Sequence, residues 1–175
     1  RDQLRPPQLE RVASRLDDSI GLVEHTVETM RDVAGALRPL MLDDYGLAVT
    51  LRAHAEQCSG RTGIRTVLHA RDPVLRMSQA VEGTLFRIAQ EALTNLLKHS
   101  QADVVRIALE VGRDEVRLTI ADNGCGFDVQ ALRGHPGEGL GLLIMEERMR
   151  AIGGALHVES RRGAGTPLVA TVGRQ

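Results

Sequence analysis

The sequence predicts an α/β domain that is preceded by a long amphipathic helix. Apolar residues recur every three or four positions from Leu9 to Leu37, which is the period of a helix with one apolar face. Between Ile64 and Val172, short segments bounded by glycine or proline alternate apolar and polar residues, as strands do. Two further segments with a helical period lie among these strands. Helices and strands interspersed in this way indicate one α/β domain.

Composition limits the class of protein. The 175 residues fit one ordinary domain with a helical appendage, and 42% hydrophobic residues are enough for a packed core. A net charge of −1 gives no reason to expect nucleic acid or an anionic membrane as a partner. No apolar run approaches the roughly 18 residues of a membrane span. Cys58 and Cys125 lack metal-ligand spacing, so we expect reduced thiols in a cytoplasmic protein.

The N-terminal helix should end before Pro39. Its single apolar stripe needs a second helix or a second copy to cover it, and packing on its own domain is the alternative. A turn and a second helix, about Leu47 to Gln57, follow. The stretch from Ser59 to Gly63 is typical of a boundary, so we expect two parts, residues 1–60 and 61–175.

Each element of the second part has its own signal. Proline and glycine bound most of the segments, and Gly112-Arg113-Asp114 is typical of a tight hairpin turn. Because Pro167 lacks a backbone donor, the last strand should lie at an edge or begin late. The expected strands are Ile64–His69, Val104–Val111, Glu115–Ala121, Ala155–Ser160 and Thr166–Val172, and the expected helices are Met77–His99 and a segment that begins after Gly137 and ends near Ile152.

A polar stripe runs beside the apolar face of the helix Met77–His99. Glu91, Asn95 and Lys98 lie at i, i+4 and i+7, and Lys98 is the only lysine among 22 basic residues. Carboxylate and amide oxygens suit Mg²⁺, and an ammonium suits a phosphate oxygen. An ordinary solvated helix face with a Glu–Lys pair is the alternative, and the stripe taken alone favours it.

A carboxylate is expected to point inward at the end of a strand. Asp122 has the same parity as the core-facing Val116, Leu118 and Ile120, and the glycines of Asn123-Gly124-Cys125-Gly126 follow it. Two glycines let a backbone approach a flat ligand, and an amino group such as adenine N6 would satisfy the aspartate. An aspartate that caps a turn explains the same pattern equally well.

Glycines also precede the last helix. Residues 128–136 have no regular period and indicate a mobile loop, after which Gly137-Glu-Gly-Leu-Gly-Leu142 opens a helix. Glycines at a helix N-terminus expose N–H groups and the positive end of the helix dipole to an anion. A dinucleotide fingerprint is excluded because Leu142 occupies its last glycine position and no strand directly precedes it. A P-loop is excluded because Leu97, and not glycine, precedes the only lysine.

The order and spacing of these motifs resemble the GHKL ATPase superfamily, which includes gyrase, Hsp90, MutL and the sensor histidine kinases. The resemblance covers nearly everything after Gly60. Within it, residues 139–154 and 37–47 look like the nitrate-sensor and DesK-like subfamily of histidine kinases. The motifs are EALTNLLKH at 91–99, DNGCG at 122–126, GEGLG at 137–141 and GAGT at 163–166.

The resemblance implies a fold and a set of residue roles. The fold is a Bergerat-type α/β sandwich with a left-handed βαβ unit, in which a mixed sheet carries helices on one face. Asn95 would hold Mg²⁺, Lys98 would contact phosphate, and Glu91 would lie near the metal or the attacking group. The remaining ATP-binding residues would be Asp122 at adenine N6, Gly124 and Gly126 against the ring, Thr166 in support of Asp122, and Gly139, Leu140, Gly141 and Leu142 at the phosphates.

The resemblance also implies partners. ATP would donate its γ-phosphate to a histidine on a dimerisation helix, in the same or a partner subunit of a homodimer, for relay to a response regulator. None of the six histidines precedes Asp or Glu as the family's acceptor does, and His25 on the long helix lacks the matching context. We therefore expect the acceptor helix outside this chain, which could be the cytosolic part of a membrane-bound sensor. The alternatives are a serine-directed kinase of the anti-sigma type and a non-catalytic nucleotide switch.

Overall fold

The computed structural model describes residues 40–70, 76–129, 131 and 139–174, which belong to one compact unit that begins at Pro39. The expected helix at Leu9–Leu37 and most of the expected loop at 128–136 lie outside these residues. The described helices and strands are α2 (Leu40–Thr62), β1 (Arg65–Ala70), α3 (Gln79–His99), β2 (Val104–Val111), β3 (Glu115–Asp122), α5 (Leu140–Ala151), β4 (Ala155–Val158) and β5 (Pro167–Gly173).

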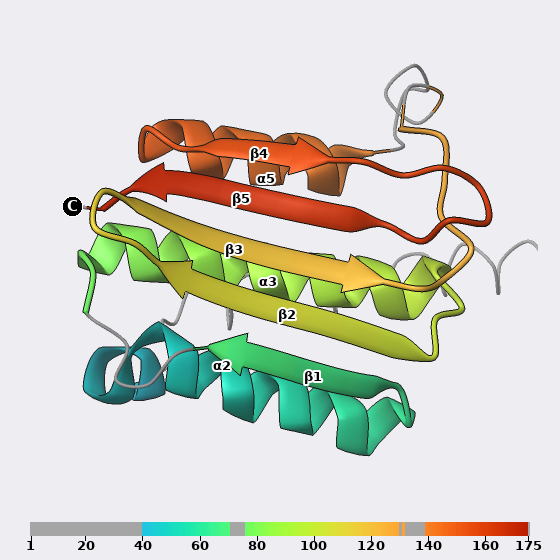
Figure 1. Ribbon diagram of the computed structural model, residues 1–175, viewed down its shortest axis with the longest axis horizontal. Helices are drawn as coiled ribbons and strands as arrows, with labels where there is room; N and C mark the ends of the chain where they lie inside the picture. The colour runs from blue at the N-terminus through green and yellow to red at the C-terminus, as the bar shows by residue number, and fades with distance from the viewer. Residues whose placement is uncertain (1–39, 71–75, 130, 132–138, 175) are drawn as a thin grey trace, which may run out of the picture. The chain divides into compact units, whose positions relative to one another are not determined.

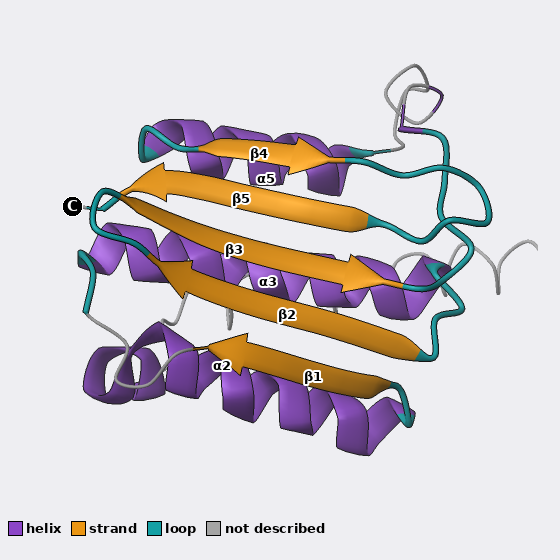
Figure 2. Ribbon diagram, viewed as in Figure 1, coloured by secondary structure: helices purple, strands orange, loops and turns teal. Residues whose placement is uncertain are grey.

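The five strands form one mixed sheet in the order β1-β2-β3-β5-β4 (Figure 1). β1 and β2 are parallel and joined through α3, whereas the other neighbouring strands are antiparallel. The described helices lie together on one face of this sheet (Figure 2). The predicted α/β class and the helices on one face are therefore confirmed. None of the described helices has the length and apolar character needed to cross a membrane.

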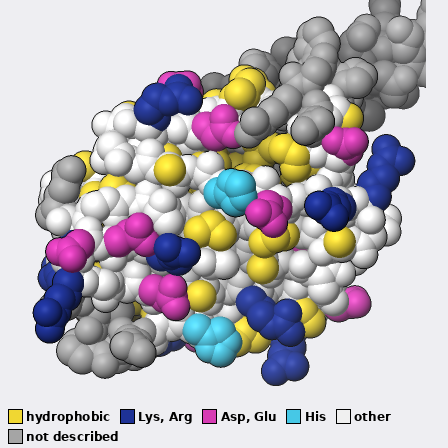
Figure 3. All heavy atoms as spheres, turned by 45° about the horizontal axis from the view of Figure 1, so that its top comes forward, with side chains coloured by type: hydrophobic (Ala, Val, Ile, Leu, Met, Phe, Trp, Pro, Cys, Tyr) yellow, Lys and Arg dark blue, Asp and Glu magenta, His cyan; other side chains and the backbone are white. Residues whose placement is uncertain are grey.

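The other face of the sheet carries side chains of mixed character. Arg106 and Glu110 on β2 and Arg117 on β3 are exposed, and Glu110 pairs in register with Arg117. Figure 3, in which the edge formed by β4 turns toward the viewer, shows acidic and basic side chains scattered among apolar ones. Charges of both signs are thus dispersed over the surface in this view.

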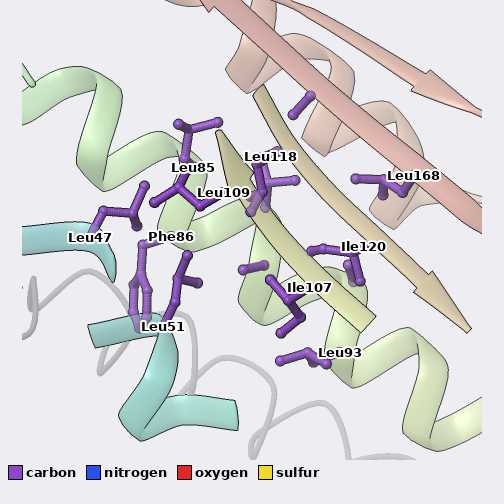
Figure 4. Close-up of a cluster of buried hydrophobic side chains, with 14 of the residues drawn as sticks. Leu47, Leu51, Leu85, Phe86, Leu93, Ile107, Leu109, Leu118, Ile120 and Leu168 are labelled. Atoms are coloured by element: carbon purple, nitrogen blue, oxygen red, sulfur yellow. The ribbon is translucent and has the colours of Figure 1, made fainter. Parts of the chain in front are cut away.

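The core fills the space between the sheet and its helices. Alternate residues of β2, β3 and β5 are buried because successive strand residues point to opposite faces. The buried face of α3 meets them, and Figure 4 shows side chains of α2 and α3 pointing toward those of the strands. The labelled members of this cluster are Leu47, Leu51, Leu85, Phe86, Leu93, Ile107, Leu109, Leu118, Ile120 and Leu168.

Helix α2 belongs to the domain, which corrects the boundary expected between residues 60 and 61. Leu47 and Leu51 are fully buried in the same core as the strands, and α2 packs on both α3 and β1. The sequence signal was misleading because Ser59 to Thr62, expected to be a boundary, are the last turn of this helix. Gly63 ends it with φ +74°, a left-handed conformation that suits glycine.

A break at Gly46 divides α2 into two helical pieces. Gly46 has φ 80° and ψ 178°, and Arg76 covers the exposed end of the first piece by donating to the carbonyls of Leu42 and Asp43 at 3.3 and 3.1 Å. The same guanidinium binds both carboxylate oxygens of Glu82, which is 1% exposed. The Arg76–Glu82 pair therefore joins the break in α2 to the first turn of α3.

The ends of the other elements agree with the expected ones to within about two residues. The strand that contains Pro167, β5, differs from the expectation in its position in the sheet. β5 lies between β3 and β4, so it is an internal strand, and the expectation of an edge position was wrong. It does begin late, at Pro167, whose carbonyl accepts from Glu159 N–H at 3.0 Å but whose nitrogen has no proton to return that bond.

Candidate functional site

The polar stripe on α3 is partly buried. Ser78 caps the N-terminus of α3. The apolar face of α3 packs on the core and so fixes the rotation of the helix, which places Glu91 and Asn95 beside the core. Asn95 Nδ2 donates to Glu91 Oε1 at 3.2 Å, so the side-chain oxygen of Asn95 remains an acceptor. Lys98 lies one turn further along and is exposed. The three residues thus share one side of the helix, as predicted.

The first turn of α5 lies directly on this stripe. A Cβ added to Gly141 would be 2.5 Å from Glu91 Oε1 and 3.3 Å from Asn95 Nδ2, so a side chain there would require the Glu91 carboxylate to shift. Gly139 begins the helix in the left-handed conformation, with φ 73°, and its carbonyl accepts from Leu142 and Leu143 N–H. The N–H groups before Leu142 precede these helical bonds and can face an anion. Leu140 is 62% exposed, whereas Leu142 is buried.

Asp122 ends β3 and is half-buried. Its Oδ1 accepts from the Gly124 N–H at 2.7 Å, and the Thr166 N–H also donates to the carboxylate. Burial raises the pKa of Asp122, and these two hydrogen bonds offset part of that rise. The aspartate therefore caps the following turn, which was the alternative interpretation. Because a carboxylate has about four lone-pair sites, it can also accept from a ligand.

The two glycines after Asp122 are needed by the protein's own main chain. A Cβ at Gly124 would lie 2.2 Å from the Ser100 carbonyl, and one at Gly126, where φ is 58°, would lie 2.1 Å from the Arg161 carbonyl. The sequence predicts that both glycines allow the close approach of a flat ligand. The structure gives each glycine a role in packing, because the backbone at the end of α3 and in the β4–β5 connection occupies the space that a side chain would need.

Thr166 supports Asp122 through its main chain. Besides donating to the carboxylate, Thr166 accepts from the Asp122 N–H at 3.3 Å. Its hydroxyl, which was expected to support the carboxylate, lies 2.9 Å from Ser160 Oγ. Gly165, with φ 69°, brings this segment against Asp122, since an added Cβ would be 2.1 Å from the Asp122 carbonyl.

Sequence reasoning missed two serines of this region. Ser100 ends α3, and its carbonyl accepts from the Cys125 N–H at 2.7 Å. Ser160 Oγ accepts from the Phe127 N–H at 2.9 Å. The one available signal was a serine close to a glycine turn, where hydroxyls often bind backbone groups. That signal is too common to identify a site.

The parts of the site share the C-terminal half of α3. Asn95 meets the first turn of α5, and Ser100 meets the turn after Asp122. Asn95 and Ser100 are five residues apart on α3, which corresponds to about 7.5 Å along the helix axis. A carboxylate suited to an amine and a helix N-terminus suited to phosphate therefore lie at the two ends of one short span. Within the described part of the chain, no three His, Cys, Asp or Glu residues form a group that could hold a metal.

Residues 80–174 match the model of the histidine kinase-, DNA gyrase B- and HSP90-like ATPases. The chain belongs to this ATPase family. The match includes α3, the Asp122 turn, α5 and the Gly163–Thr166 turn, which are the segments that build the site. The resemblance drawn from the four motifs is therefore confirmed.

Proteins similar to this ATPase domain include two bacterial kinases. The oxygen sensor histidine kinase NreB of Staphylococcus carnosus is 32% identical over 148 residues, which are 83% of this chain and 42% of that protein. The signal transduction histidine-protein kinase/phosphatase DegS of Bacillus subtilis is 37% identical over 132 residues, which are 74% of this chain and 34% of that protein. The chain thus spans less than half the length of either relative.

A solved structure has the same fold. The histidine kinase domain of the blue-light activated histidine kinase EL346 of Erythrobacter litoralis superimposes with a TM-score of 0.61 at 25% identity. The superposition covers 72% of this chain and 60% of that one. The mixed sheet with helices on one face is therefore the architecture of a histidine kinase ATPase domain.

Proposed function

We propose that this chain carries the catalytic ATP-binding domain of a two-component sensor histidine kinase. It would transfer the γ-phosphate of ATP to a histidine on a dimerisation helix, in the same or a partner subunit of a homodimer, for relay to a response regulator. The observation that carries the proposal is the contact of Gly141 with Glu91 and Asn95. It places a helix N-terminus against a carboxylate and an amide, beside the Asp122 turn.

The base end of the nucleotide would meet Asp122. Its partly buried carboxylate is held by two backbone donors and keeps acceptor sites for the N6 amine of adenine. Gly124 and Gly126 would lie beside the ring, and Thr166 would hold the carboxylate in place. Such a site favours adenine over guanine, because guanine presents a carbonyl at the corresponding edge.

The phosphate end would lie between α3 and α5. Asn95, with Glu91 beside it, offers the oxygen ligands that suit Mg²⁺, and Lys98 supplies an ammonium for a phosphate oxygen. Bound Mg²⁺ would offset phosphate charge during transfer. Gly139, Leu140, Gly141 and Leu142 would present N–H groups to the phosphates. Glu91 would lie near the metal or the attacking group.

The acceptor would come from a histidine-bearing helix. No histidine in the sequence has the acidic neighbour of the family's acceptor, and His25 lies outside the described residues. Transfer requires the reacting atoms to be held about 3–3.5 Å apart in line, which a docked helix achieves and a freely diffusing one does not. ATP as the phosphate donor favours a cytoplasmic location for this domain.

Phosphotransfer in trans tests the proposal. The 175-residue chain, labelled ATP and Mg²⁺ are mixed with a helical hairpin that carries a histidine followed by an acidic residue. Label should move to the hairpin at a rate that rises with its concentration, and it should be lost in acid and survive base. A hairpin in which that histidine is replaced by alanine is the matched control.

The other outcomes select the alternatives. Acid-stable label would indicate a serine-directed kinase and overturn the histidine assignment. Nucleotide binding without transfer to any hairpin would indicate a nucleotide switch. Acid-labile label on the chain alone that vanishes in His25→Ala would show that His25 is itself an acceptor.

A further inference from the structure

Ser160 joins three segments of the site that are distant in sequence. Its Oγ lies 2.9 Å from the Phe127 N, 3.0 Å from the Gly165 O and 2.9 Å from the Thr166 Oγ1. The first contact reaches the turn after Asp122, and the other two reach the turn before β5. The half-buried hydroxyl therefore connects the two glycine turns that surround Asp122.

The directions of these hydrogen bonds follow from the chemistry of the groups. A hydroxyl has one proton and two acceptor lone pairs. The Phe127 N–H can only donate, and the Gly165 carbonyl can only accept. Ser160 must therefore give its single proton to Gly165, and satisfying the third contact requires the Thr166 hydroxyl to donate to Ser160. All hydrogen-bonding positions of Ser160 are then used, and Thr166 Oγ1 retains only acceptor sites.

We propose that Ser160 is a positioning residue for base recognition, which holds the two glycine turns together and makes Thr166 an acceptor. This inference rests on the proposed binding of ATP. Two further bonds connect the same turns, Gly165 N–H to the Gly124 carbonyl at 3.0 Å and Gly163 N–H to the Cys125 carbonyl at 2.6 Å. A change at Ser160 is therefore transmitted to Asp122 through Thr166 and to Gly124 through Gly165.

The polarity set by Ser160 affects which bases fit. Asp122 presents a carboxylate and Thr166 a hydroxyl oxygen without an available proton, so a group near either must donate. The amino group of adenine donates, whereas the carbonyl of hypoxanthine only accepts. Without Ser160, the Thr166 proton is released and can be offered to a carbonyl. Ser160 thus strengthens the preference for an amino base.

Binding of ADP and of inosine diphosphate separates this role from a merely structural one. Affinities for both are measured by calorimetry for the parent chain, Ser160→Ala and Ser160→Thr. In Ser160→Ala the ADP affinity should fall about tenfold and the inosine diphosphate affinity by less than about threefold, since one hydrogen bond is worth this much. Ser160→Thr keeps the hydroxyl and should restore most of the preference.

Two controls complete the test. Ser78→Ala removes the cap of α3 at its far end, where Ser78 Oγ accepts from Val81 N–H, and should lower the thermal midpoint without changing the ADP to inosine diphosphate ratio. Amide exchange at Phe127 should be at least about tenfold faster in Ser160→Ala than in the parent. This second measurement is independent of whether Ser160→Thr folds.

The failures are distinguishable. If the parent fails to bind ADP, the proposed function is wrong and the inference fails with it. If the parent binds ADP and Ser160→Ala loses both ligands equally, Ser160 has only a structural role and the inference is overturned. A folded Ser160→Thr that does not recover the ratio, or unchanged Phe127 exchange in Ser160→Ala, also overturns it.

Discussion

Gly141 lies so close to Glu91 that a side chain at position 141 would require the Glu91 carboxylate or the first turn of α5 to move. A Cβ on residue 141 would be 2.5 Å from Glu91 Oε1, which is well inside van der Waals contact. The absence of a side chain at Gly141 therefore lets the first turn of α5 lie against the Glu91 side chain of α3. This contact aligns the start of α5 with the residues assigned to the phosphates.

Gly141→Ala should separate phosphate binding from base binding. The added methyl group must displace Glu91 or the first turn of α5, so ATP affinity in Mg²⁺ should fall about tenfold or more while adenosine affinity changes little. Overpacking of this kind costs roughly 1–3 kcal/mol. Gly60→Ala is the matched control, because an added Cβ meets nothing within 4 Å there. Equal ATP affinity in both variants, measured by calorimetry, would contradict the contact.

Asn95→Ala should weaken the dependence of ATP binding on Mg²⁺ more than it weakens adenine recognition. The motivation is the side-chain oxygen of Asn95, which remains an acceptor beside Glu91. Mg²⁺ is titrated at fixed ATP, and ADP binding without metal is measured in parallel. Thr94→Ala is the control, since its hydroxyl bonds to the Gln90 carbonyl of its own helix. Superimposable Mg²⁺ curves for Asn95→Ala and the parent would indicate that the stripe is only a solvated surface.

Asp122→Asn should cost about 2–3 kcal/mol in ADP binding, because a charged acceptor is lost and an amide donor faces the N6 amine. Asp114→Asn, in the exposed turn at the other end of β3, should leave ADP affinity unchanged. Burial raises the pKa of Asp122, so in the parent ADP affinity should fall on acidification before an ordinary aspartate would protonate. The ADP affinity of the asparagine variant should not show this fall on acidification. A parent and variant with the same calorimetric pH profile would rule out Asp122 as the titrating group.

Arg76→Ala should destabilise the domain by about 1.5–3 kcal/mol, because it removes two charge-assisted hydrogen bonds from the buried carboxylate of Glu82. It also removes the donors that cover the Leu42 and Asp43 carbonyls at the break in α2. Arg117→Ala is the control, since its pair with Glu115 is exposed and worth at most about 1 kcal/mol. Urea unfolding measures both. Equal midpoints for the two variants would show that the buried pair contributes no more than a surface pair.

His54 should make the stability of the domain depend on pH. It lies in α2 with its ring edge-on to Phe86 of α3, at a centroid distance of 5.6 Å, and burial lowers its pKa below the ordinary value of 6.5. The unfolded chain then binds a proton that the folded chain does not, so the free energy of unfolding should decrease as pH falls below about 6.5. The stability difference between the parent and His54→Phe should change over this window. A constant difference in urea unfolding would exclude His54 as the cause.

Local periodicity was sufficient to predict the five strands, α3 and α5, and the sides of β3 and α3 on which their polar residues lie. The strand parity of Val116 to Ile120 placed Asp122 at an inward position, and the helical period placed Glu91 and Asn95 together. Both inferences depend only on residues within one element. They succeed because the directions of side chains in helices and strands repeat regularly.

Contacts between distant segments were decided by the tertiary structure. Whether α2 joins the core depends on the surface that α3 and β1 present to it. Whether the Thr166 hydroxyl bonds to Asp122 or to Ser160 depends on the path of the β4–β5 connection. The same holds for Gly124 and Gly126, whose missing side chains make room for the carbonyls of Ser100 and Arg161. Such contacts turn on differences of a few tenths of an ångström between segments that the sequence does not place relative to each other, because tight packing accepts one arrangement and excludes its neighbours.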